Sequence, residues 1–112
     1  MDKREKMSLG EFVCRMVKGW GFAMPHEVIR IGRALEKSLP KEDFNKEVKI
    51  LFSSFSEGWG PSSHYHYKWW VEGYEPSAEG KLPPDMRDCI FGRSSAPYLV
   101  KGEGGFAVGF DY

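Results

Sequence analysis

The chain has 112 residues, of which 41% are hydrophobic and 15% aromatic, and its net charge is zero. This length predicts a single domain spanning residues 1–112, and the aromatic content excludes a disordered chain. The balanced charge lacks the strongly basic patch typical of nucleic-acid binding. No apolar run approaches the ~20 residues of a membrane helix, and no apolar signal segment follows the charged start, so we expect a cytoplasmic protein without membrane contact.

The first half of the chain predicts helices. We expect residues 1–7 to form a flexible charged segment and residues 8–56 to form a helical half. Ser8 and Glu11 have the spacing of a capping box at the start of the first helix, and a second helix follows Pro25. A third helix is predicted after Pro40 because its apolar residues recur at helical spacing. These residues are Phe44, Val48, Leu51, Phe52 and Phe55.

The second half, residues 57–112, predicts strands. A turn at 58–61 precedes a strand over 63–71, and a short helix is expected over 84–91. Two β-rich runs, 97–101 and 106–112, flank a glycine-rich loop and predict a hairpin. Grouped helices followed by grouped strands indicate an α+β fold, with three N-terminal helices packed on an antiparallel sheet of three or more strands in the C-terminal half.

The strand over 63–71 contains the best candidate site, because alternate side chains of a strand share a face. Tyr65, Tyr67, Trp69 and Val71 form the set that we expect in the core. His64, His66, Lys68 and Trp70 form the opposite set and are the predicted binding residues. We interpret Trp70 as an apolar anchor, Lys68 as a charge at the rim, and the two histidines as hydrogen-bonding, pH-sensitive groups. The alternative that the helices or the 73–97 loop cover this face stays open.

A metal site is the first alternative for the same residues. Two histidines separated by one residue on a strand lie roughly 6.5–7 Å apart, and zinc needs three or four protein ligands. Asp111, Glu72 or His26 would have to complete a site built on His64 and His66. Cys14 and Cys89 show no metal-binding spacing and are expected to be buried thiols. We therefore expect no cofactor.

The functional prediction is a small non-enzymatic interaction module. No catalytic sequence motif is present, and the partner is expected to be another protein or a second copy of this chain. The size, neutral charge and lack of catalytic motifs resemble those of small accessory proteins such as phage-encoded inhibitors or immunity proteins, although no motif identifies a family. A small metal-dependent or acid–base enzyme using His64 and His66 is one alternative, and a single-stranded nucleic-acid binding module, which is not favoured, is another.

Overall fold

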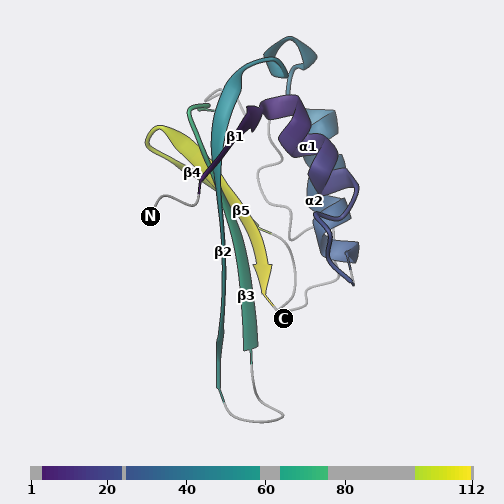
Figure 1. Cartoon of the computed structure of the whole chain (residues 1–112), viewed down its shortest axis with the longest axis vertical. Helices are drawn as coiled ribbons and strands as arrows, with labels where there is room; N and C mark the ends of the chain where they lie inside the picture. Colours follow the sequence, from purple (N-terminus) through teal and green to yellow (C-terminus); the bar gives the residue numbers. More distant parts are fainter. Residues whose placement is uncertain (1–3, 24, 59–63, 76–97, 112) are drawn as a thin grey trace.

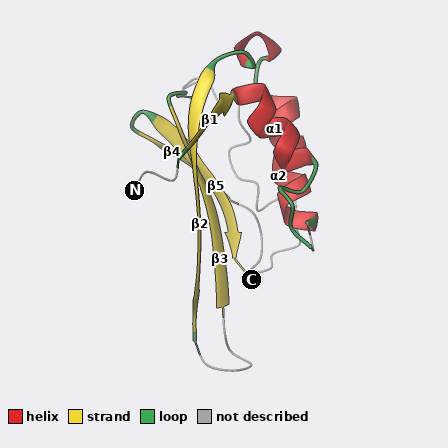
Figure 2. Ribbon diagram, viewed as in Figure 1, coloured by secondary structure: helices red, strands yellow, loops and turns green. Residues whose placement is uncertain are grey.

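The computed structural model describes residues 4–23, 25–58, 64–75 and 98–111. In chain order its elements are β1 (Glu5–Ser8), α1 (Leu9–Val17), α2 (His26–Ser38), the short 3-10 helix η1 (Lys41–Asp43), β2 (Glu47–Glu57), β3 (His64–Glu72), β4 (Tyr98–Gly102) and β5 (Gly105–Asp111). The strands form one antiparallel sheet in the order β1-β2-β3-β5-β4. Figures 1 and 2 show α1 and α2 together on one face of this sheet. No helix in the described part of the chain has the length and apolar character needed to cross a membrane.

The prediction of three N-terminal helices is wrong, because the third expected helix is the strand β2. Its buried residues Val48 and Ile50 alternate along the strand, and Phe52, the next residue in that series, packs against the core. The apolar residues of this segment fit both a helical period and a period of two. β2 is paired on both sides, with β1 and with β3, and this long-range pairing overrides the helical spacing.

The sheet therefore begins earlier than predicted and is not confined to the second half of the chain. The expected flexible segment 1–7 contains most of β1, whose register runs from Glu5 opposite Ile50 to Ser8 opposite Glu47. The predicted helix over 84–91 lies outside the described residues. The hairpin of β4 and β5 is confirmed, with a tighter turn than expected at Glu103 and Gly104.

Helix α1 begins as the capping box predicts, since the Ser8 hydroxyl accepts a hydrogen bond of 3.1 Å from the Glu11 backbone N–H. The two helices cross closely at Gly32 of α2. A Cβ atom placed on Gly32 would lie 2.6 Å from the Met16 carbonyl carbon of α1. The absence of a side chain at this position therefore lets the two helix backbones approach. Cys14, which we expected to be buried, is exposed on α1.

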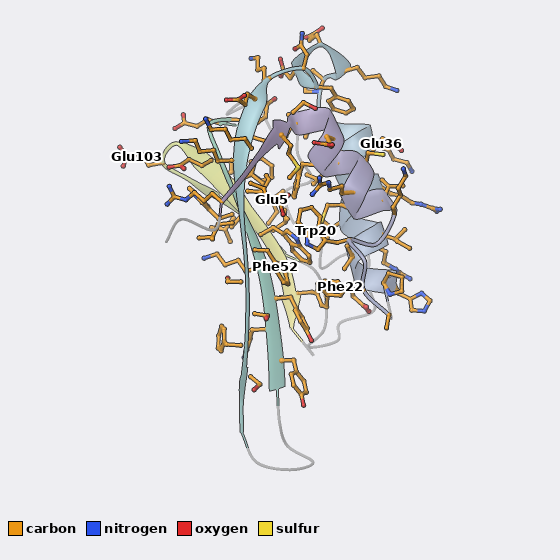
Figure 3. The ribbon with its side chains drawn as sticks, in the orientation of Figure 1. Glu5, Trp20, Phe22, Glu36, Phe52 and Glu103 are labelled. Carbon is orange, nitrogen blue, oxygen red and sulfur yellow. The ribbon has the colours of Figure 1, made fainter. Side chains whose placement is uncertain are left out.

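The core between helices and sheet is rich in aromatic rings and is centred on Trp69, which is fully buried. Its ring lies 4.9 Å from the Phe52 ring and 5.7 Å from the Phe22 ring, between centroids. Figure 3 shows Trp20, Phe22 and Phe52 in the space between the sheet and the helices. The indole nitrogen of Trp69 has no hydrogen-bond acceptor among the described residues.

A hydrogen bond of 2.6 Å from the Tyr74 hydroxyl to the Asp43 carboxylate joins the chain after β3 to η1. Lys46 is 3.3 Å from the same carboxylate. Burial, reinforced by the hydrogen bond and the charge of Asp43, raises the pKa of Tyr74 well above its ordinary value of 10.0. The contact therefore depends on a protonated Tyr74.

We expect Tyr74→Phe to lower the free energy of unfolding by about 1.5 kcal/mol at pH 7, the value of a hydrogen bond to a charged group. The pKa of Tyr74 is higher in the folded than in the unfolded protein. The contribution of its hydrogen bond to the free energy of unfolding is therefore complete below pH ~10 and is lost as the pH rises further. Urea unfolding of the wild-type protein and of Tyr74→Phe from pH 7 to 11 measures this contribution. The difference between their free energies of unfolding should narrow above pH ~10. A difference that stays constant across this range would contradict the assignment.

Candidate functional site: the outer face of the sheet

The side chains of β3 divide between the two faces of the sheet. Trp69 and Val71 are fully buried on the helix side, whereas Lys68 is exposed and Trp70 half-buried on the opposite face. We call this opposite face, which the helices do not cover, the outer face (Figure 1). The prediction that only one of the two adjacent tryptophans enters the core is confirmed. Tyr65, expected in the core, is instead 48% exposed, because β3 extends beyond the helices at this end.

An apolar row crosses the outer face over four strands. The register places Leu51 of β2 opposite Trp70, Trp70 opposite Ala107 of β5, and Ala107 opposite Val100 of β4. We call these four residues the apolar row. Leu51 and Trp70 are half-buried, Ala107 is buried, and Val100 is 56% exposed. The row therefore presents apolar surface on the side of the sheet away from the core.

The glycines of the β4–β5 hairpin hold the indole of Trp70 in place. A Cβ atom on Gly102 would lie 3.0 Å from the Cη2 atom of Trp70, and one on Gly105 would lie 3.1 Å from its Cζ2 atom. The Trp70 ring therefore packs closely against the backbone of this hairpin, where a larger residue than glycine would contact it.

A second aromatic feature lies further along the outer face, where the rings of Phe55 and His66 stack. Their centroids are 4.4 Å apart with an interplanar angle of 19°, and Phe55 is 60% exposed. Sequence reasoning missed Phe55 as a surface residue because it placed it in a helix. A period-two interpretation of residues 47–57 would have put Phe55 on the same face as Leu51.

The predicted histidine pair is only partly described. His66 is half-buried and Asp111 occupies the register position opposite it, whereas the side chains of His64 and Asp111 lie outside what the structure describes. Glu72 is six residues further along β3 and forms a 3.1 Å ion pair with Arg4. His26 begins α2, in the layer on the other side of the sheet. Among the side chains that were described, no group of three potential metal ligands occurs.

Charge is unevenly distributed on the outer face. The register brings Lys6 of β1 opposite Lys49 of β2, and Lys49 opposite Glu72. Lys68 adds a further exposed positive charge beside the apolar row.

Comparison with protein-family models, with curated proteins and with solved structures found no match. The apolar row and the charged residues around it are therefore the features of this chain that point to a function.

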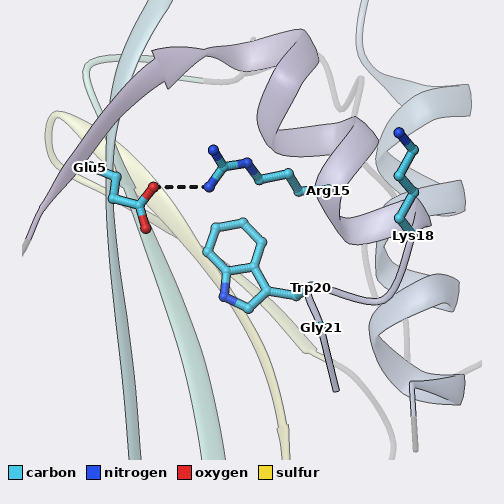
Figure 4. A pocket seen from close by; sticks show the side chains of 5 residues that line it. All are labelled: Glu5, Arg15, Lys18, Trp20 and Gly21. Carbon is cyan, nitrogen blue, oxygen red and sulfur yellow. Dashed lines mark hydrogen bonds and ion pairs between the residues drawn. The ribbon is translucent and has the colours of Figure 1, made fainter. Parts of the chain in front are cut away.

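A separate depression of about 350 Å³ opens between β1 and the end of α1, lined by Glu5, Arg15, Lys18, Trp20 and Gly21 (Figure 4). Arg15 donates a 2.9 Å hydrogen bond to Glu5 and lies over the Trp20 ring, 5.6 Å from its centroid. Trp20 adopts a φ of 54°, between two glycines that also have positive φ. The Arg15 guanidinium in this depression is thus paired within the protein. The sequence did not predict this depression, because it did not predict the strand β1 that forms one side of it.

Proposed function

We propose that this chain is a non-enzymatic, cytoplasmic interaction module of the inhibitor or accessory type, which binds a protein partner through the outer face. The observation that carries the proposal is the placement of Trp70. Its indole is half-buried on the side of the sheet away from the helices and is held by Gly102 and Gly105. Tryptophan is enriched among residues that dominate binding energy, and a preorganised side chain loses little entropy on binding.

The surroundings of Trp70 support the same proposal. Val100 extends the apolar surface at one end of the apolar row, and Lys68 lies beside it at the rim. Centres of protein interfaces are apolar and poor in charge, while the rim is polar. His66, stacked on Phe55, supplies a hydrogen-bonding group at the edge of this surface. With Lys6 and Lys49 also near the apolar row, we expect the partner surface to carry acidic side chains.

We expect Trp70→Ala to weaken binding of the partner by at least ~2 kcal/mol, because the truncation removes the apolar anchor. Proteins captured from the native host with the wild-type chain would be identified by mass spectrometry, and the affinity of the main partner measured by calorimetry. Tyr65→Ala is the matched control, since Tyr65 is an exposed aromatic residue of the same strand on the other face.

Gly102→Ala provides a second variant that displaces the indole without removing it, because the added methyl group would contact the Trp70 ring. It should weaken binding in the same direction as Trp70→Ala. A partner whose affinity is unchanged by Trp70→Ala would contradict the proposed function. Binding of an oligonucleotide with strong salt dependence would instead favour the nucleic-acid alternative.

A further inference from the structure

Among the described residues, one edge of β2 has no neighbouring strand along most of its length. Strand β1 pairs only with residues 47–50 of β2, and its register ends with Glu5 opposite Ile50. Beyond that point, no described residue pairs with the edge of β2 over residues 51–57. In a strand paired on one side, alternate residues direct backbone N–H and C=O groups to the other side. This segment, which we call the free edge, can therefore accept another strand.

The free edge lacks the features that normally prevent strand pairing. The short edge strand β1 carries Glu5 and Lys6, and the other edge strand, β4, carries Lys101. Residues 51–56 read Leu-Phe-Ser-Ser-Phe-Ser, with no charge and no proline. Natural sheets protect their edges with lysine, proline or bulges, and an unprotected apolar edge invites pairing. The composition of this segment therefore leaves it suited to pairing with another strand.

We propose that the free edge pairs antiparallel with the same edge of a second copy, around a two-fold axis at Phe55. Phe55 would then lie directly opposite Phe55 of the second copy, Ser54 opposite Ser56, and Ser53 opposite Glu57. Phe55 is the most exposed large apolar residue described, and aromatic pairs across strands are stabilising. No like charges face each other in this register, and a two-fold contact closes without forming fibres.

The sequence around Phe55 also favours a second copy as the occupant. Ser54 and Ser56 flank Phe55 symmetrically, so a two-fold axis at Phe55 pairs each serine with the other serine across the contact. The three central residue pairs therefore contain no charge and match in size on both sides of the axis.

The proposed dimer contact is centred on Phe55 and shares only Leu51 with the apolar row, so Trp70 and Val100 stay accessible in both copies. A strand contact of this length buries less than the ~1,200–2,000 Å² of a stable interface. We therefore expect a concentration-dependent equilibrium between monomer and dimer. The dimer would join two five-stranded sheets edge to edge, with the two apolar rows on the same outer face.

Sedimentation velocity over a wide range of protein concentration tests this inference. The wild-type chain should shift from monomer to dimer as its concentration rises, whereas Phe55→Lys and Phe55→Glu should each stay monomeric because two like charges would meet at the axis. An equimolar mixture of the two variants should form a 1:1 dimer. Tyr65→Lys is the matched control, since Tyr65 is similarly exposed on the neighbouring strand, and it should dimerise like the wild type.

Circular dichroism checks that each variant is folded, which we expect because Phe55 is largely exposed. A wild-type chain that stays monomeric at all concentrations would overturn the inference. So would a dimer that persists in Phe55→Lys, or a mixture of the two charged variants that fails to associate. Trp70→Ala should dimerise normally, so that failure of the proposed function and failure of the dimer can be told apart.

Discussion

Replacing Gly32 with alanine should lower the free energy of unfolding by about 3 kcal/mol, at the upper end of the cost of overpacking. The added methyl group would lie 2.6 Å from the Met16 carbonyl carbon, and backbone atoms of a helix cannot move aside as a flexible side chain can. α1 and α2 would have to separate and lose part of their shared core. Urea unfolding followed by circular dichroism measures the loss.

The sign of this effect is diagnostic, because alanine favours helix over glycine by about 1 kcal/mol when packing is not involved. Helix propensity alone therefore predicts that Gly32→Ala stabilises the protein. Arg33→Ala is the matched control, since Arg33 is the next residue of α2 and is exposed, and it should change stability by less than about 0.5 kcal/mol. A stabilised Gly32→Ala variant would show that the helices do not cross closely at this position.

Truncating Trp69 to alanine should cost about 4 kcal/mol, as expected for a large buried aromatic residue. Trp69 is fully buried, and its ring contacts those of Trp20, Phe22, Phe52 and Phe110. Removing it leaves a cavity at the centre of the aromatic core, where the surrounding rings can only partly collapse. The free energy of unfolding is again the measured quantity.

Trp69→Phe should cost clearly less than Trp69→Ala. A phenyl ring fills much of the space, and the substitution removes an indole N–H that has no acceptor among the described residues. Burying an unsatisfied donor is unfavourable, so its removal offsets part of the lost packing. If Trp69→Phe proved as damaging as Trp69→Ala, the indole nitrogen would have a hydrogen-bond partner in the folded protein.

The parts of the fold that sequence reasoning found are those with a clear local pattern. β3 alternates along most of its length, and the side chains of Phe106, Val108 and Phe110 in β5 share one buried face, as expected from a period of two. The capping box of α1 was equally visible. The outer face could be placed from the β3 pattern because two adjacent tryptophans cannot both point into one core.

The parts that sequence reasoning missed depend on contacts between distant segments. β2 fits a helical spacing as well as a strand, and its pairing with β1 and β3 decides between them. Four residues of β1 are too few to show a period. Phe55 and the depression around Arg15 were missed for the same reason, since each depends on one of these two strands.

The place of β5 in the sheet has a consequence for protein synthesis. β5 is translated after the other described strands, yet it lies in the interior of the sheet, between β3 and β4. Until β5 has left the ribosome, β3 lacks one neighbour and β4 has no strand to join. The nascent chain therefore cannot close its sheet strand by strand, and we expect the last step of folding to be the insertion of β5 after its translation.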